Sequence, residues 1–310
     1  MSDPTPILLD CDPGHDDAIA LLLALASPEL ELLGVTTVAG NQTLPKTTAN
    51  ALRVLEFVGR GDVPVAAGAD RPLARELFIA AYVHGESGLD GPALPEPTGT
   101  PVDRHAVDFL AEKILGSDRP VTLVPVGPLT NIALLLARYP ETAENVERIV
   151  IMGGAIAEGN VTPAAEFNIY VDPEAARRVF RSGLPLTMIG LDVTHKALVT
   201  GAHAERLRAS GAAGRMVAEL YDFFIEYHRR TYGWEGGPIH DAVAVAQVLR
   251  PGIVETLHRH VDVDCESKLC RGRTVVDLWR RTGEEPNADV GVGIDADGFL
   301  ELLCERIGCL

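Results

Sequence analysis

Aromatic and cationic residues are both scarce in this chain of 310 residues. Phe, Trp and Tyr make up 5% of it. Beside its many Ala, Leu and Val residues, this favours helices packed on a buried sheet over an all-β sandwich. Lys and Arg number 27 against 44 Asp and Glu, which gives a formal net charge of −17. Because nucleic acids and anionic membranes are polyanions, neither is an expected partner.

Long apolar runs are also missing. No segment reaches the roughly 18 apolar residues that a membrane-spanning helix needs. Residues 1–6 are polar, and no basic stretch leads into an apolar one, so the pattern of a secretion signal is absent. Together these absences predict a cytoplasmic protein.

Cysteine is rare and odd in number: Cys11, Cys265, Cys270, Cys304 and Cys309. An odd count in a chain without a signal indicates reduced thiols. The pairs Cys265/Cys270 and Cys304/Cys309 share a four-residue gap that is loose for zinc, and no His stands at a supporting interval. We expect small buried thiols, although spacing alone assigns the two pairs no role.

Short apolar runs alternate with helical stretches along the chain. Residues 7–9, 30–38 and 63–67 are predicted strands, and residues 18–26 and 47–58 are predicted helices. This β-α-β-α-β order implies a parallel sheet with crossover helices.

The alternation resumes after a stretch at residues 71–101 that is rich in Gly and Pro and typical of an active-site loop. Further strands are predicted at 121–126, 148–152, 186–190 and 290–294, helices at 102–115, 131–137, 173–181, 202–229, 239–249 and 299–307, a β-ribbon at 261–264 and 273–277, and a turn at 295–298. With no repeat or linker, residues 1–310 are predicted to form a single α/β domain, in which helices flank a mostly parallel central sheet.

Four aspartates follow the first strand within eight residues: Asp10, Asp12, Asp16 and Asp17. Asp10 and Asp12 share one face of the strand. Asp16 and Asp17 begin a helix, where the positive end of the dipole favours carboxylates. The intervening Pro-Gly turn brings the two pairs together.

Confining so many carboxylates without a cation would cost much free energy. A hard divalent ion bound through oxygen is the natural remedy, and calcium tolerates irregular coordination whereas magnesium demands an octahedron. The alternative to a metal site is that these aspartates only cap the helix and are otherwise solvated.

A phosphohydrolase is the second enzyme class that this segment permits. Haloacid dehalogenase-type enzymes also open with Asp-x-Asp, use the first Asp as nucleophile and bind magnesium, which would make Asp10 the nucleophile. Those enzymes usually have Thr or Val where this chain has Gly14, and they usually lack an Asp-Asp pair four residues on. Phosphate-binding-loop, His-Glu-x-x-His and nucleophile-elbow patterns are all absent.

The motifs beyond this segment resemble those of the inosine–uridine-type nucleoside hydrolases. The matching residues are Asp10-Cys11-Asp12-Pro13-Gly14-His15-Asp16-Asp17-Ala18, Thr36-Thr37-Val38-Ala39-Gly40-Asn41, His84-Gly85-Glu86-Ser87-Gly88, Gly127-Pro128-Leu129-Thr130-Asn131, Met152-Gly153-Gly154, Glu158-Gly159-Asn160, Glu166-Phe167-Asn168, Asp172-Pro173-Glu174-Ala175, Gly190-Leu191-Asp192-Val193-Thr194-His195 and His240-Asp241. They span nearly the whole chain in the family's order. His15, the loop from His84 to Pro97 and Glu226-Tyr227-His228 are most similar to the pyrimidine-preferring (cytidine and uridine) branch.

The resemblance implies a Rossmann-like nucleoside hydrolase fold and hydrolysis of the N-glycosidic bond of a ribonucleoside to ribose and free base. It implies Ca²⁺ bound by Asp12, Asp17, Asp241 and the backbone carbonyl of Val126. Some relatives have Thr in place of Val126, but only the carbonyl is needed. Asp12 would be the general base toward a calcium-bound water, and Asp10 would support the site from behind.

The resemblance also implies the residues that hold the substrate. The ribose would be held by Asp16, Asn41, Asn160, Glu166 and Asn168, with Met152 packed beneath it. At the base, His240 would protonate the leaving group, His228 and Tyr232 would contact it, Trp234 is a further stacking candidate, and His84 would belong to a covering loop.

Two alternatives stay open beside the pyrimidine preference and the distant magnesium phosphohydrolase. One is a broad or purine-tolerant (inosine–uridine) hydrolase, and the other is a non-catalytic nucleoside-binding protein. The expected partners are a small ribonucleoside and, by resemblance, further copies of the chain in a homotetramer.

Overall fold

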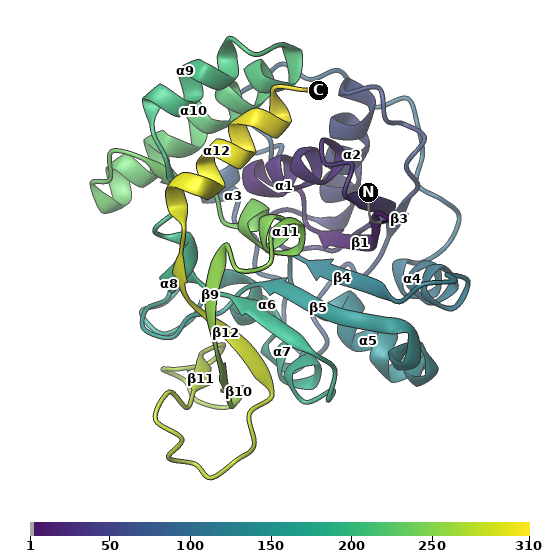
Figure 1. Cartoon of the computed structure of the whole chain (residues 1–310), viewed down its shortest axis with the longest axis vertical. Coiled ribbons are helices and arrows are strands. Elements are labelled where there is room, and N and C mark those ends of the chain that lie inside the picture. The colour runs from purple at the N-terminus through teal and green to yellow at the C-terminus, as the bar shows by residue number, and fades with distance from the viewer. Residues whose placement is uncertain (1–2) are drawn as a thin grey trace.

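The computed structural model describes residues 3–310, and its centre is an eight-stranded sheet with the order β3-β2-β1-β4-β5-β6-β12-β9 (Figure 1). The strands are β1 (Thr5–Cys11), β2 (Leu30–Thr37), β3 (Val65–Ala67), β4 (Val121–Pro125), β5 (Val146–Met152), β6 (Leu186–Ile189), β9 (Val254–Arg259) and β12 (Ala288–Ile294). All neighbours pair in parallel except β9 and β12. Every residue of β4 is buried, as expected for a strand with helices on both faces.

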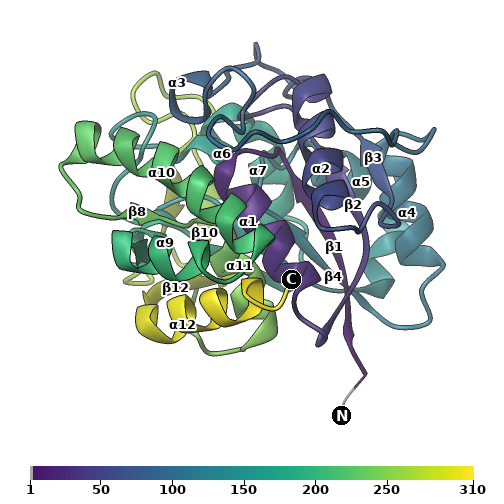
Figure 2. The same ribbon diagram turned by 90° about the horizontal axis from the view of Figure 1, so that it is seen from above.

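Two helical layers cover the sheet. One layer contains α1 (His15–Leu25), α2 (Leu44–Phe57), α9 (Gly201–Arg208), α10 (Ala212–Tyr232), α11 (Asp241–Leu249) and α12 (Ala296–Ile307). The other contains α4 (Ala106–Leu115), α5 (Thr130–Arg138) and α7 (Pro173–Phe180). Figure 2 shows α9, α10 and α12 gathered on one side of the molecule and α2, α4 and β3 on the other.

Shorter elements complete the chain: α3 (Ala81–His84), α6 (Phe167–Val171), α8 (Leu191–Thr194), a 3₁₀ turn (Pro140–Asn145), the pair β7 (Leu198–Val199) and β8 (Gly237–Pro238), and the pair β10 (Val261–Val263) and β11 (Thr274–Val276). The α/β class with a mostly parallel sheet is thus confirmed, as is the β-ribbon. Within residues 3–310, no helix has the length and apolar character to cross a membrane.

Four local predictions need correction. The helix predicted over 202–229 is two helices, because Gly211 takes a positive φ of 132° that ends the first and starts the second. The helix predicted from residue 102 begins at Ala106, after a cap by the His105 side chain. The turn predicted at 295–298 is the start of α12, where Asp295 accepts the N–H of Gly298 at 3.0 Å. Strand β9 was missed.

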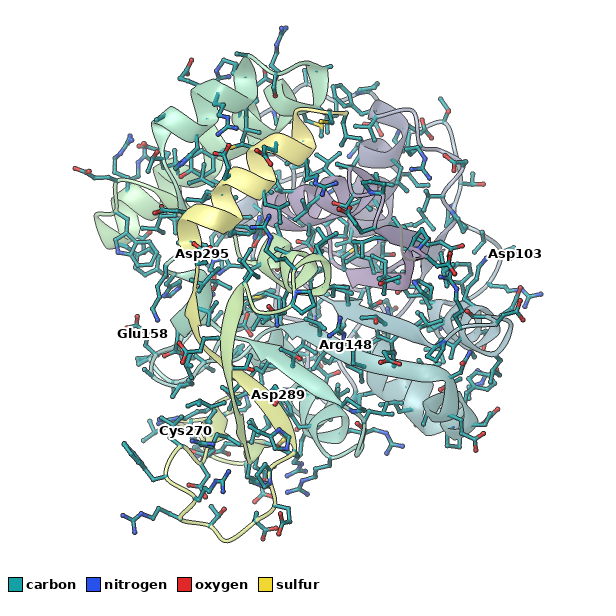
Figure 3. The ribbon with its side chains drawn as sticks, in the orientation of Figure 1. Asp103, Arg148, Glu158, Cys270, Asp289 and Asp295 are labelled. Carbon is teal, nitrogen blue, oxygen red and sulfur yellow. The ribbon has the colours of Figure 1, made fainter. Side chains whose placement is uncertain are left out.

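The cysteines are all free thiols, as predicted. Cys11, Cys265 and Cys304 are buried as expected, but that prediction was wrong for Cys270, which is partly exposed, and for Cys309, which is exposed. Figure 3 places Cys270 in the arm formed by β10 and β11. Over the described part of the chain, the one group with metal-binding geometry contains no cysteine.

Candidate active site

The site lies where the order of strands in the sheet reverses. From β1 the chain moves outward to β2 and β3, then returns to β4 on the other side of β1 and continues to β5 and β6. Open parallel sheets bind ligands beyond the carboxyl ends of their strands at such a reversal. The N–H of Val126 donates to the carbonyl of Asp10 at 2.8 Å, which holds the segment after β4 beside the end of β1.

Three buried carboxylates meet beyond this edge from two helices. Asp16 and Asp17 lie in the first turn of α1, and Asp241 is the first residue of α11. One oxygen of each lies within 4.8 Å of the others. The packing of α1 against α11 therefore assembles a group that chain order separates.

Asp12 adjoins this group and is fully buried. Its Oδ2 atom accepts the N–H of Asn41 at 2.6 Å, and its own N–H donates to Asp17 Oδ1 at 3.0 Å. Asp12 Oδ1 is buried without a hydrogen-bond partner among residues 3–310. Such an atom is costly unless a ligand satisfies it, so its surroundings fit a bound cation or water.

Burial and mutual repulsion disfavour the ionised form of these acids. Burial first, and the charge of Asp17 second, raise the pKa of Asp12 well above its usual range and the pKa of Asp16 to about 8. Burial and then the charges of Asp16 and Asp17 raise the pKa of Asp241 well above its usual range. A divalent cation would offset both the cost of burying these charges and the repulsion between them. A set of oxygen ligands fits a hard ion such as calcium or magnesium.

Asp10 lies outside the cavity and supports it. Its Oδ1 accepts from Thr36 Oγ1 at 2.5 Å and from Asn131 Nδ2 at 2.8 Å. The Oδ1 atom of Asn131 in turn accepts the N–H of Ala69 at 2.9 Å. Burial raises the pKa of Asp10 to about 7. A side chain this enclosed cannot reach a phosphate ester, which argues against the phosphohydrolase alternative.

Val126 lines the same cavity as Asp16 and Asp241. Asn168 donates from Nδ2 to the Val126 carbonyl at 2.8 Å and to the carbonyl of Met152 at 3.1 Å. A carbonyl oxygen has two lone pairs, so Val126 keeps one for a further partner. Asn168 thereby ties the ends of β4 and β5 together at the cavity wall.

Glu166 forms the adjoining wall as the N-cap of α6. Its carboxylate accepts the N–H groups of Gly154 at 2.9 Å, Asn168 at 2.9 Å and Ile169 at 3.2 Å. Burial raises the pKa of Glu166 to about 7 despite these donors. Asn160 is held by accepting the N–H of Phe167 at 2.9 Å, so both polar side chains are fixed by backbone groups.

Histidines and aromatic rings line another part of the cavity, which we call the imidazole end. His228 on α10 donates from Nδ1 to the carbonyl of Phe224 at 3.0 Å, and it stacks on Tyr232 with ring centroids 5.7 Å apart. His240 contacts the hydroxyl of Thr194 at 2.7 Å through Nδ1. Burial lowers the pKa of His228 to about 4 and that of His240 well below its usual range. Both rings are therefore neutral at neutral pH.

The structure brings nearly all the predicted site residues to one cavity. Its lining includes Asp16, Asn41, His84, Val126, Met152, Asn160, Glu166, Asn168, His228, Tyr232, His240 and Asp241. Asp12 and Asp17 lie behind the lining, in contact with Asn41. The division of cation, ribose and base contacts among these residues remains a prediction.

Eight lining residues were not predicted: the aliphatic Ala80, Val83 and Val161, and the ring-bearing Tyr82, Phe167, His195, Phe224 and Tyr227. Two of them were detectable, because Phe224 lies four residues before His228 and Tyr227 lies three residues after Phe224, so both neighbour the face of α10 that carries His228. His195 lies edge-on to His240, with centroids 5.7 Å apart. Its Nδ1 atom is 3.7 Å from a carboxylate oxygen of Glu158, a residue near the molecular edge (Figure 3).

Trp234 stands behind this wall rather than in it. It stacks on Tyr232 with ring centroids 4.7 Å apart and on His228 at 6.0 Å, and it is not among the lining residues. Its contacts support the aromatic wall, whereas base stacking by Trp234 itself stays a prediction.

The fold and the site define a nucleoside hydrolase, an enzyme that cleaves N-glycosidic bonds. The sequence profile of the family described as "Inosine-uridine preferring nucleoside hydrolase" matches residues 7–301, and the chain belongs to that family. It is 57% identical over 304 residues to the pyrimidine-specific ribonucleoside hydrolase RihA of Salmonella typhimurium, covering 97% of this chain and 98% of the relative.

Solved structures show the same fold. A purine-preferring ribonucleoside hydrolase from Gardnerella vaginalis has a TM-score of 0.93 and 36% identity, covering 98% of both chains. The plant nucleoside hydrolase PpNRh1 has a TM-score of 0.92 and 36% identity, covering 98% of this chain and 99% of its own. Proteins of this fold thus carry names with opposite base preferences, so the fold alone does not select the base.

Proposed function

We propose that the chain hydrolyses pyrimidine ribonucleosides such as uridine and cytidine, with a calcium ion held by Asp12, Asp17, Asp241 and the carbonyl of Val126. One observation carries the proposal: a buried acidic group and neutral imidazoles line a single cavity. The pyrimidine-specific name of the Salmonella typhimurium relative supports the choice of base.

The bound ion would supply a template for the ribose diol and would lower the pKa of an attacking water. Asp12 Oδ1 is the atom placed to take that water's proton, because it has no other partner among the described residues. Asp12 Oδ2 accepts the N–H of Asn41, and this hydrogen bond holds the carboxylate in one orientation.

The polar walls of the cavity would read the ribose. Asp16, Asn41, Asn160, Glu166 and Asn168 offer carboxylate and amide groups to its hydroxyls, with Met152 packed beneath the ring. The carboxylates would also stabilise the positive charge that develops on the sugar as the bond to the base breaks.

The leaving base would meet the imidazole wall. For His240 to donate toward the base, Nε2 must carry the proton and Nδ1 must accept from the Thr194 hydroxyl, 2.7 Å away. The carbonyl of Phe224 fixes the proton of His228 on Nδ1, so Nε2 of His228 is an acceptor. An acceptor at this place suits the N3–H of uracil or the amino group of cytosine, and Tyr232 packs beside it.

Release of ribose tests the proposal. Purified protein is incubated with uridine, cytidine, inosine and 2′-deoxyuridine, with calcium or with a chelator, and reducing sugar is measured. We expect a higher kcat/KM for uridine and cytidine than for inosine, loss of activity in chelator, and at least about a hundredfold preference for uridine over 2′-deoxyuridine. No ribose from any nucleoside at ample calcium would refute hydrolysis, and a preference for inosine would favour the purine-tolerant alternative.

Oligomeric state and location complete the proposal. We propose a homotetramer, supported by the family resemblance, and a cytoplasmic enzyme, supported by five free cysteines, which suit a reducing compartment. Sedimentation velocity tests the first, and fractionation of the source cells tests the second.

A further inference from the structure

His15 is a buried residue that the proposed mechanism does not use. It is the first residue of α1, is 1% exposed and does not line the cavity. Its Nε2 lies 2.7 Å from the carbonyl oxygen of Asp90, and its Nδ1 lies 3.0 Å from Nδ1 of His84. His84 does line the cavity. A chain of contacts therefore runs from the Asp90 backbone through His15 to His84, which lines the cavity.

The partners of His15 determine where the protons lie. A carbonyl oxygen only accepts, so Nε2 of His15 carries the proton. The ring packs against Phe223 and Phe224 with centroids 5.2 and 5.8 Å away, a setting that penalises a second proton and its charge. Nδ1 of His15 is then an acceptor, and the proton of the 3.0 Å contact belongs to Nδ1 of His84. A neutral His84 in this form has a bare Nε2.

His84 lies beside Asn41, and its ring also stacks on Phe224 with centroids 5.8 Å apart. Nε2 of His84 has no hydrogen-bond partner in the described part of the chain, although the ring lies in the cavity wall. A Cβ atom placed on Gly14 would lie 2.7 Å from His84 Nδ1 and 2.9 Å from the amide of Asn41, so the two side chains are neighbours. Asn41 is one of the residues proposed to bind ribose.

We propose that His15 is a positioning residue: it fixes His84 as the Nδ1–H tautomer, so that Nε2 of His84 accepts a hydrogen bond from a ribose hydroxyl. The proposal rests on the proposed function, since the hydroxyl belongs to a ribonucleoside. A rigid acceptor needs no reorganisation when the substrate arrives, whereas an imidazole free to exchange tautomers presents a donor part of the time.

One contact supports the opposite arrangement. The backbone N–H of His15 also points at Nδ1 of His84, at 3.3 Å. If Nδ1 of His84 accepted this N–H, it would carry no proton and Nε2 of His84 would be a donor. Nδ1 of His15 would then have to donate in the 3.0 Å contact, so His15 would be doubly protonated. The two arrangements present opposite chemistry to the cavity, so a measurement can separate them.

The tautomer of His84 is measurable in the wild-type protein without substrate. Histidine is labelled with ¹⁵N, long-range ¹H–¹⁵N correlations are recorded, and the His84 signals are assigned by their loss in His84→Gln. We expect a pyrrole-type shift for Nδ1 and a pyridine-type shift for Nε2. The reverse pattern, or the averaged shifts of two exchanging tautomers, would overturn the proposal. Hydrolysis is tested separately by ribose release, so the two failures are distinguishable.

Kinetics of two matched variants test the consequence. His15→Asn keeps an acceptor oxygen near the position of Nδ1, whereas His15→Phe keeps a ring against Phe223 and removes the acceptor. We expect His15→Phe to lower kcat/KM for uridine about tenfold, as for loss of one neutral hydrogen bond, and His15→Asn to stay within about threefold of wild type.

A double-mutant cycle separates positioning from general damage to the fold. In a His84→Phe background, His15→Phe should have no further effect on kcat/KM, because its only route to the substrate is gone. A further loss of about tenfold there, or equal impairment by His15→Asn and His15→Phe in the wild-type background, would overturn the proposal. If His15→Phe does not fold, the spectrum of the wild-type protein still decides.

Discussion

The two ends of the cavity are built in opposite ways. At the acidic end, the polar side chains are buried and held by backbone groups; Glu166 alone accepts three N–H groups. At the imidazole end, the contacts are mainly between rings; His228 and His240 are buried, but Tyr82 and Tyr232 are 54% and 37% exposed. The first set comes mainly from the ends of core strands and the starts of helices. The second comes from α10, from Tyr82 on α3, and from His195 and His240 next to α8 and α11.

This contrast assigns different tasks to the two ends. A rigid, charged arrangement suits the part of the substrate that every ribonucleoside shares, because preorganised groups need no rearrangement as charge develops. A half-exposed aromatic wall suits the part that varies between substrates. We therefore expect changes at the acidic end to reduce turnover on every nucleoside, and changes at the imidazole end to alter the choice of base.

The largest effect should follow Asp12→Asn, which removes the proposed base and keeps its shape. We expect kcat/KM to fall about a thousandfold with uridine and with inosine alike. The variant should fold, because a cluster that repels itself loses one charge. Exposed Asp103→Asn (Figure 3) is the matched control and should leave activity unchanged. Turnover like that of wild type in Asp12→Asn would reject Asp12 as the base.

The next effect concerns the stability of the acidic end. The pKa values of Asp16 and Glu166 are about 8 and about 7 in the folded chain, against ordinary values of 3.8 and 4.5. Acids with raised pKa values bind protons more tightly when folded. Their stabilising contribution is complete below about pH 4 and is lost as the pH rises to about 8.

In chelator, the Tm should therefore fall as the pH rises from about 5 to about 8. Calcium should raise the Tm at about pH 8 by about 5 °C or more, and by less at about pH 5. Thermal melts in matched buffers measure both. If the Tm in chelator instead rises with pH, ionisation of the buried carboxylates does not destabilise the folded chain, and the prediction is wrong.

A smaller and more selective effect should follow His228→Phe at the imidazole end. Losing one neutral acceptor should lower kcat/KM for uridine about tenfold. The ratio of uridine to inosine should change, while the preference for uridine over 2′-deoxyuridine should not. Asn168→Ala at the acidic end is the comparison and should impair uridine and inosine to the same degree. If His228→Phe lowers kcat/KM for uridine and inosine to the same degree, the imidazole end does not select the base.

The smallest effect should come from Tyr82→Phe at the exposed rim. No hydrogen bond of its hydroxyl is seen within residues 3–310, and its nearest aromatic neighbour on α10 is Tyr227, 6.2 Å between centroids. We expect kcat/KM for uridine to stay within about threefold of wild type. A loss above tenfold would show that the rim is as rigid as the acidic end.

Most of the sheet was predictable because its strands are short apolar runs between helices, and polar or Gly residues end them. The two misjudged helices have local causes: Gly211 interrupts one, and the His105 cap delays the other. Strand β9 was missed because its burial depends on pairing with β12, which follows it by almost thirty residues.

The site was predictable to a similar extent and for a different reason. Asp12, Asp16 and Asp17 form one dense segment, so the acids are recognisable before any fold is known. Asp241 and Val126 entered only through the resemblance. His195 and Tyr82 were missed, since a single His or Tyr outside a pattern carries no local signal of its place in a cavity.

By itself, the sequence determined the alternation of strands and helices and the concentration of charge after β1, because both are local properties of neighbouring residues. Only the tertiary structure decided which distant groups share the cavity. The packing of α1 on α11 brings Asp241 to Asp17, and the reversal of strand order brings Val126 beside Asp10. The contact of His15 with His84 likewise joins residues 69 positions apart. Burial then supplies the raised carboxyl pKa values and the neutral imidazoles, which depend on the surrounding atoms and not on neighbours in the chain.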